Sequence, residues 1–256
     1  MEQFSTSSSE RQIAPRRGDY GFDAPYVPAI FALMGLVLLV FSLLSFLLWQ
    51  SLVWGIIDLL VSIYMLLSAA SYIYTTRRGK FEVWSEMLSH LDLRGDEQVL
   101  DMGCGRGMVL LMVASLLPQG KASGVDIWSS GDQSGNALEA TRKNAQLEGV
   151  AEKIELHTAD MRQLPFDDGS FDLVLSSLAI HNIPNNAGRK QALDEAMRVL
   201  KPGGKLIIAD LSETARYVEH LRGLAVSNVT HQALGWRFWY GSPWFATKLV
   251  TALKAS

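Results

Sequence analysis

The stretch QVLDMGCGRGMVLLMVASLL, from Gln98 to Leu117, decides the fold. It runs through a short apolar segment to Asp101, passes glycines at positions 103, 105 and 107, and continues with a helical pattern. Glycine tolerates positive φ angles and lets a ligand approach the main chain closely. We therefore expect a strand, a tight turn that holds a ligand, and a helix, which together form one unit of an alternating α/β sheet.

Strand and helix patterns alternate from residue 84 to the end of the chain. Strands are expected at 97–103, 120–128, 153–160, 171–180, 205–211, 226–240 and 247–255, and helices at 84–93, 108–118, 136–149, 188–204 and 213–224. This alternation predicts a doubly wound, mostly parallel, seven-stranded sheet with helices on both faces. The last two strands should form an antiparallel pair at one edge.

Acidic residues stand at the ends of three successive strands, where such sheets bind ligands. The glycine spacing is G-x-G-x-G rather than the G-x-G-x-x-G of dinucleotide sites, and Asp101 before it would repel a pyrophosphate and attract an ammonium group. Asp126 can accept both hydroxyls of a ribose. Asp160 can accept from an exocyclic adenine amine while the Met161 main chain faces the ring edge. Together they describe a site for an adenosine that carries an amino acid.

Four segments, VLDMGCGRG, GVDI, ADMRQLPFDDGSFDLVLSSLAIHNI and EAMRVLKPGGKLIIADL, resemble class I S-adenosylmethionine-dependent methyltransferases. They are most similar to the branch of ubiquinone/menaquinone-type C-methyltransferases, over residues 95–212. The resemblance implies a Rossmann-like methyltransferase fold and S-adenosyl-L-methionine as cofactor. It also implies a role for each matching residue: Asp101, Gly103 and Gly105 at the methionine part, Asp126 at the ribose, Ile127 and Trp128 flanking the adenine, Asp160 and Met161 at its edge, and Ser176 near the sulfonium. We expect Cys104 to be a small filler beside the ligand rather than a nucleophile, because no partner histidine is indicated.

Two features near this site have open interpretations. The segment WSSGDQSGN, residues 128–136, is inserted relative to the resembled family, and it is either a lid over the cofactor or a longer turn. His181 in AIHNI, with Asn182 beside it, is the candidate catalytic base on the acceptor side, and a structural role for this histidine is an equal alternative. The sequence offers no clear metal-binding cluster.

The apolar excess of the chain lies near its N-terminus. Hydrophobic residues make up 48% of the 256 residues and charged residues 19%. Residues 28–49 carry no charge, and 52–74 carry only Asp58, so each run matches the roughly 20 residues that cross a ~30 Å hydrocarbon core. The first run is too long for a signal peptide. A transmembrane helical hairpin is therefore expected, with a buried hairpin in a soluble fold as the alternative.

Charge places this hairpin relative to the cytoplasm. Arginines and lysine lie outside both ends of the hairpin, and the short link between the two runs carries none. The positive-inside bias then predicts a multi-pass membrane protein of two spans with both termini and the catalytic domain in the cytoplasm. We expect a disordered polar tail at 1–24, two transmembrane helices within 25–76, and a methyltransferase domain at 77–256.

These observations favour a methyltransferase that uses S-adenosylmethionine on a small or lipidic, membrane-associated acceptor. Two alternatives stay open: a catalytically silent, membrane-anchored protein that binds the cofactor, and an NAD-linked oxidoreductase, against which the glycine spacing and Asp160 speak. The net charge of −3 argues against nucleic acid as a partner. The aromatic segment 234–245 either packs the edge strands or walls the acceptor pocket.

Overall fold

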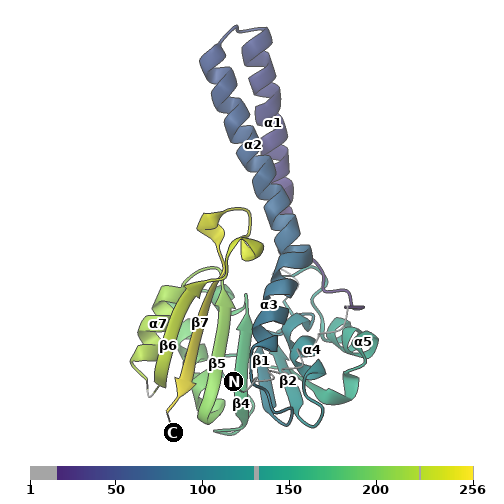
Figure 1. The fold of residues 1–256 in the computed structure, drawn as a ribbon, viewed down its shortest axis with the longest axis vertical. Helices are drawn as coiled ribbons and strands as arrows, with labels where there is room; N and C mark the ends of the chain where they lie inside the picture. The colour runs from purple at the N-terminus through teal and green to yellow at the C-terminus, as the bar shows by residue number, and fades with distance from the viewer. Residues whose placement is uncertain (1–15, 130–132, 225, 256) are drawn as a thin grey trace, which may run out of the picture.

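One mixed sheet organises the C-terminal part of the computed structural model, which describes residues 16–129, 133–224 and 226–255 (Figure 1). The strands, in the order β3-β2-β1-β4-β5-β7-β6, are β3 (Ile154–Thr158), β2 (Lys121–Asp126), β1 (Gln98–Met102), β4 (Phe171–Ser177), β5 (Leu200–Asp210), β7 (Lys248–Lys254) and β6 (Val226–Ala233). Neighbours from β3 to β5 pair in parallel, whereas β7 pairs antiparallel with both β5 and β6. The predicted doubly wound sheet and its antiparallel edge are thus confirmed.

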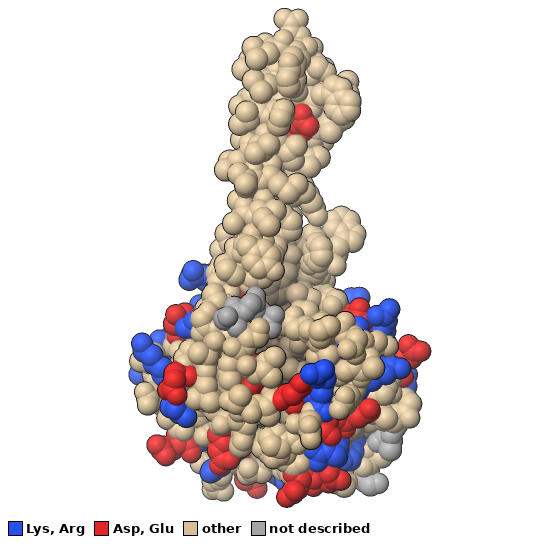
Figure 2. Space-filling view, turned by 180° about the vertical axis from the view of Figure 1, so that it is seen from behind, with Lys and Arg blue, Asp and Glu red and all other residues tan. Residues whose placement is uncertain are grey.

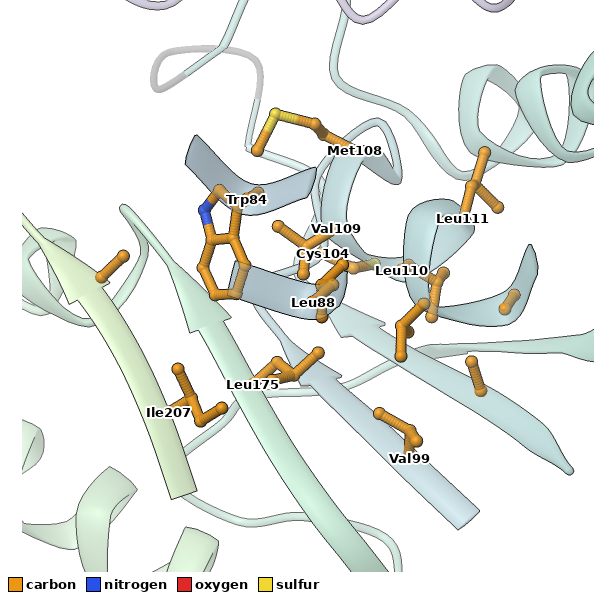
Figure 3. Close-up of a cluster of buried hydrophobic side chains, with 14 of the residues drawn as sticks. Trp84, Leu88, Val99, Cys104, Met108, Val109, Leu110, Leu111, Leu175 and Ile207 are labelled. Carbon is orange, nitrogen blue, oxygen red and sulfur yellow. The ribbon is translucent and has the colours of Figure 1, made fainter. Parts of the chain in front are cut away.

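Helices cover both faces of the sheet. Successive side chains of the central strands point to opposite faces and are apolar on both, so each face needs a layer of helices to bury it. The helices are α3 (Lys80–Ser89), α4 (Met108–Ser115), α5 (Leu138–Glu148), α6 (Asn186–Val199) and α7 (Thr214–Arg222). Val99 and Leu175 belong to one apolar cluster, with Trp84 of α3, as Figure 3 shows. Leu100 and Val174, one residue away on the same strands, belong to the cluster on the opposite face. The strand order reverses direction between β1 and β4, and ligands bind outside the strand ends at such a switch point.

Several predicted elements have different bounds in the structure, and three of the differences have a clear cause in the backbone. The helix expected at 188–204 ends at Val199, because Leu200 is extended and begins β5. The strand expected at 171–180 ends at Ser177, because Leu178 has a φ of +55°. The strand expected at 226–240 ends at Ala233, because Gly235 with a φ of +80° turns the chain into two short 3-10 helices, Trp236–Phe238 and Pro243–Phe245.

Two long apolar helices form a hairpin that stands out from the sheet domain (Figure 1). They are α1 (Tyr26–Leu47) and α2 (Leu52–Tyr74), and α2 continues through a π-helical segment η1 (Thr75–Gly79) into α3. Both are long and apolar enough to cross a membrane, and only 17% and 22% of their most apolar windows are buried. A core helix of a soluble protein would be mostly buried, so the low burial separates these helices from that class.

The contact between α1 and α2 is made by small residues. Gly35, Ser42, Gly55 and Ser62 are buried along the seam. The Ser42 hydroxyl donates to the Gly55 carbonyl at 2.8 Å, and the Ser62 hydroxyl donates to the Gly35 carbonyl at 2.6 Å. Small residues and interhelical hydrogen bonds are typical of helix contacts inside membranes, where lipid solvates the large apolar side chains.

The sequence predicts a disordered polar tail at 1–24. Residues 1–15 lie outside the described part, and residues 16–24 are ordered against the sheet domain, contrary to the expectation. The main-chain N–H groups of Arg17 and Gly18 donate to the Glu148 carboxylate at 2.8 and 2.7 Å, and the Tyr20 hydroxyl donates to the same group at 2.8 Å. Tyr20 is also buried in the core beside α3. These long-range contacts, invisible in local composition, hold residues 16–24 against the sheet domain.

Candidate active site

A cavity of about 380 Å³ lies beyond the carboxyl ends of β1 to β4 and extends to the base of the hairpin. Its wall includes most of the residues predicted from the sequence: Asp101, Gly103, Cys104, Gly105, Asp126, Ile127, Asp160, Met161 and His181. Trp128 and Ser176 lie outside this lining. The Trp128 indole donates to the Thr158 hydroxyl at 2.7 Å, and the buried Ser176 hydroxyl donates to the Met102 carbonyl at 2.9 Å.

The glycine loop after β1 is fixed by its main chain. Gly103, Gly105 and Gly107 have φ angles of +75°, +51° and +87°, a region that favours glycine. The N–H groups of Gly103 and Cys104 donate to the Val125 carbonyl of β2 at 2.8 and 3.1 Å. A Cβ atom at Gly103 would lie 2.2 Å from the Ala179 Cβ, so only glycine fits between β1 and the loop after β4.

Asp101 is a buried carboxyl group with unused hydrogen-bonding capacity. It is 1% exposed, and its Oδ1 atom has no hydrogen-bond partner among the described residues. Burial, opposed by a hydrogen bond from the Leu110 main chain and reinforced by nearby Asp126, raises the pKa of Asp101 to about 7. A cationic group at this wall of the cavity would satisfy the oxygen and favour the charged carboxylate.

The Asp126 carboxylate accepts from three donors, one of which belongs to the glycine loop. Its Oδ2 atom accepts from the Gly105 N–H at 2.8 Å, and Oδ1 accepts from the Trp128 N–H at 2.6 Å and from the Asn136 amide at 3.3 Å. A carboxylate has about four acceptor positions, so capacity for a ligand hydroxyl is limited. Asn136 also lines the cavity, and its Oδ1 atom is buried with no partner in the described residues. The sequence did not single out Asn136, which offers a second acceptor beside Asp126.

Asp160 faces a guanidinium group that the sequence reasoning missed. Arg162, two residues further along, donates to both carboxylate oxygens of Asp160, with Nη2 at 2.5 Å from Oδ2. Its side-chain hydrogen bond is the main cause that lowers the pKa of Asp160. Asp160, Met161 and Arg162 all line the cavity, so the edge of a bound ring would meet a paired carboxylate rather than an isolated one.

His181 is held by a fully buried carboxylate. Its Nδ1 atom bonds to Asp210 at the end of β5, and its main-chain N–H donates to the same residue at 3.1 Å. Asp210 also accepts from the Tyr217 hydroxyl at 3.2 Å and from the Leu211 N–H at 2.8 Å. Because a carboxylate accepts, Nδ1 carries the proton, and Nε2 is the ring nitrogen that can accept one. The signal that could have found Asp210 is its place as an acid at a strand end.

The side of the cavity nearest the hairpin is built by residues far apart in the sequence. Lys80 is buried, and its ammonium group lies 2.8 and 2.6 Å from the two carboxylate oxygens of Asp23. The Tyr240 hydroxyl donates to the same carboxylate at 2.6 Å, and the Tyr72 hydroxyl of α2 donates to the Asp23 carbonyl at 3.0 Å. All four residues line the cavity, together with Tyr26 at the start of α1. Sequence patterns gave no signal for this cluster.

The inserted segment 128–136 contacts the N-terminal segment, although residues 130–132 lie outside the described part. Gln133 forms a β-bridge with Asp23, and its side-chain amide donates to the Tyr20 carbonyl at 3.0 Å. Gln133 Oε1 also accepts from the Arg106 N–H of the glycine loop at 3.1 Å. Residues 133–136 therefore join the N-terminal segment to the glycine loop, which is more than a longer turn would do.

The central part of the chain is similar in sequence to known methyltransferases. A family model described as a methyltransferase domain matches residues 99–204. The chain is 34% identical over 137 residues to the demethylmenaquinone methyltransferase of Symbiobacterium thermophilum, covering 53% of this chain and 51% of the relative. It is 35% identical over 127 residues to a sterol 4-C-methyltransferase of Caenorhabditis elegans, covering 50% and 35%. The chain thus spans about half, or less, of the length of these relatives.

A solved structure shows the same fold. The geranyl diphosphate C-methyltransferase of Streptomyces coelicolor A3(2), in complex with Mg²⁺, geranyl diphosphate and S-adenosyl-L-homocysteine, superposes with a TM-score of 0.55. The match covers 72% of this chain and 82% of that chain at 16% identity. At this identity the likeness shows the fold alone.

Proposed function

Because the chain carries a class I S-adenosylmethionine-dependent methyltransferase domain, we propose that it methylates a lipidic acceptor that enters from a membrane. One observation supports this most directly. A single cavity joins the unsatisfied Asp101 and the glycine loop at one end to Tyr26 and Tyr72 of the apolar hairpin at the other. The cofactor and an acceptor from the membrane would therefore meet in one cavity.

The residues of the cavity fit the cofactor. Asp101 accepts from the cationic amine of the methionine part, and the glycine loop lines the cavity beside it. Asp126 and Asn136 share the ribose hydroxyls, because Asp126 alone is nearly saturated. Asp160 and the Met161 main chain meet the adenine edge.

Bound S-adenosylmethionine supplies a methyl group that its sulfonium already activates, so transfer requires alignment and, for an acceptor that carries a proton, a base. His181 takes that proton at Nε2, while its Nδ1–H stays hydrogen-bonded to the Asp210 carboxylate. Asp210 is a positioning residue, because it fixes the tautomer and ring orientation without touching the acceptor. The Tyr217 hydroxyl bond holds Asp210 in turn.

The membrane part of the proposal rests on the hairpin. Large side chains such as Leu33, Leu36 and Leu67 are exposed along α1 and α2, and Asp58 is the one charged residue on either helix, in keeping with the single acidic group on the hairpin in Figure 2. Arg77 and Arg78 follow α2 directly, which favours a cytoplasmic domain. The two relatives are named for a menaquinone precursor and a sterol, and both kinds of molecule are lipids.

Calorimetry and turnover test this function on the full chain in lipid nanodiscs. The wild type should bind S-adenosylmethionine, and Asp101→Asn should weaken binding about 10- to 100-fold, the loss expected for a charge-assisted hydrogen bond worth about 1.5–3 kcal/mol. Asp167→Asn, an exposed carboxyl in the turn before β4, is the matched control.

Methyl transfer from radiolabelled S-adenosylmethionine to a membrane lipid extract separates an enzyme from a silent binder. Label should enter the lipid fraction with the wild type, and His181→Gln should lower the rate without changing cofactor affinity. Binding without any transfer would favour the catalytically silent alternative. Binding of NAD instead would overturn the proposal.

A further inference from the structure

The aromatic loop, residues 234–247 between β6 and β7, lies along the hairpin rather than over the sheet (Figure 1). Trp236 stacks on Tyr74 with ring centroids 5.3 Å apart, and Trp244 meets Tyr64 edge-on at 6.3 Å. Tyr64 and Tyr74 are ten residues apart on α2, which is about 15 Å along a helix axis. The loop therefore accompanies α2 over nearly half of its length.

The docking of this loop on the helix is close and specific. The Thr75 hydroxyl donates to the Trp239 carbonyl at 2.6 Å. A Cβ atom at Gly79 would lie 1.8 Å from the Arg237 carbonyl oxygen, so the helix and the loop backbone touch at a glycine. On the hairpin side, Gly241 lies close enough to α1 that a Cβ there would be 3.0 Å from the Phe31 ring. The loop and the hairpin are thus in close contact through both side chains and backbone.

The outer side of the loop is apolar and uncovered. Trp244 is 78% exposed, Trp236 61% and Phe245 55%, values that are unfavourable for a cluster of large aromatic groups in water. Arg237 is the one charged residue of the loop, and it pairs with Glu86 on α3. Apart from an acidic group on the hairpin, Figure 2 shows the charged side chains gathered on the sheet domain.

Part of the loop backbone is hydrogen-bonded within the loop. The main-chain N–H of Tyr240 donates to the Phe245 carbonyl at 3.0 Å, and the N–H of Phe245 donates to the Ser242 carbonyl at 3.0 Å. The N–H of Thr247 donates to the Phe238 carbonyl at 3.1 Å. Irregular backbone enters a bilayer only when its polar groups are satisfied within the protein. Exposed tryptophans also prefer the boundary between headgroups and acyl chains.

We propose that the aromatic loop is immersed in the bilayer beside the hairpin and forms the lip over which a lipidic acceptor enters the cavity. Its outer tryptophans contact lipid, while Tyr240 on its inner side lines the cavity with Tyr26 and Tyr72. The entry role rests on the proposed methyl transfer, whereas immersion of the loop does not. A lipid can then pass from the leaflet to His181 without crossing water.

Spin-label accessibility tests immersion on the full chain in nanodiscs of phosphatidylcholine and phosphatidylglycerol. Labels are placed by Trp244→Cys in the loop, Leu67→Cys on the exposed face of α2, and Leu147→Cys on α5 as the aqueous control. Cys104 is the only native cysteine, and burial raises the pKa of its thiol well above the ordinary value, so it stays unlabelled. The label at 244 should resemble that at 67, open to oxygen and closed to a water-soluble nickel complex.

The outcomes separate the two proposals. A nickel-accessible label at 244 beside a lipid-facing label at 67 would overturn loop immersion and leave the membrane hairpin standing. A nickel-accessible label at 67 would remove the hairpin from the bilayer and overturn both.

The entry role has its own readout, because Trp244 and Phe245 lie outside the site that would hold the cofactor. The double variant Trp244→Ser/Phe245→Ser should bind S-adenosylmethionine like the wild type and lose transfer to lipids in nanodiscs. Transfer at the wild-type rate would overturn the lip.

Discussion

The hairpin and the sheet domain bury opposite kinds of residue. The domain closes over Trp84, Val99, Leu100 and Leu175, whereas the seam of the hairpin holds serines and glycines and turns its leucines outward. In water, burial of apolar area drives folding; in lipid, large apolar side chains gain nothing by leaving the surface, and close backbone contact matters instead. The difference is what we expect if the hairpin lies in lipid, as proposed, and the domain lies in water.

The largest expected effect tests this contrast with one substitution made in both regions. Leu175→Ala, at a fully buried site of β4, should lower the free energy of unfolding of the domain by about 2–5 kcal/mol, since it leaves a cavity. Leu33→Ala, on the exposed face of α1, should change stability by less than about 0.5 kcal/mol in nanodiscs. Urea denaturation followed by circular dichroism measures both, and equal losses would break the contrast.

The local hydrophobic pattern predicted most of the strands and helices, because the spacing of apolar residues differs between the two kinds of element. It also located the glycine loop, Asp101, Asp126, Asp160 and His181 at one cavity, since parallel strands end at the same edge. It failed for the cluster of Asp23, Lys80 and Tyr240, whose members are brought together only by the docking of the N-terminal segment, α3 and the aromatic loop.

Side-chain direction was the second limit of sequence reasoning. Ser176 and Ser177 both close β4, and a strand points successive side chains to opposite faces. The structure turns Ser177 to the cavity and bonds Ser176 to the Met102 carbonyl. For Trp128, a φ of +60° redirects the indole toward Thr158, which no composition rule predicts. A role for either residue in cofactor binding stays a prediction.

A smaller effect is expected on the pH dependence of stability. It comes from Asp101, the buried carboxyl group of the domain with an unsatisfied oxygen, whereas the serine hydroxyls in the seam of the hairpin are hydrogen-bonded. The pKa of Asp101 is raised from 3.8 to about 7 by burial, so the folded chain without ligand holds a proton that the unfolded chain releases. Between pH 4 and 7 the unfolded state therefore binds fewer protons, and stability falls as pH rises.

Cofactor binding should show the opposite trend in this range. A cationic amine favours the ionised Asp101, so affinity for S-adenosylmethionine should fall below pH 7, by up to about tenfold per pH unit for one coupled proton. Calorimetry from pH 5.5 to 8.5 measures this slope, and Asp101→Asn should flatten it. An unchanged slope in the variant would assign the proton to another group.

The smallest expected effect tests the seam itself. Ser62→Ala removes the hydroxyl that donates to the Gly35 carbonyl, and hydrogen bonds between membrane helices are worth about 0.6 kcal/mol on average. Ser42→Ala removes the equivalent bond to Gly55 at another level of the hairpin, so the double variant should lose the sum of the two. Titration of the bicelle-embedded chain with dodecyl sulfate measures these losses. A loss of several kcal/mol for either serine would contradict this prediction, because a single hydrogen bond between these helices is not worth that much.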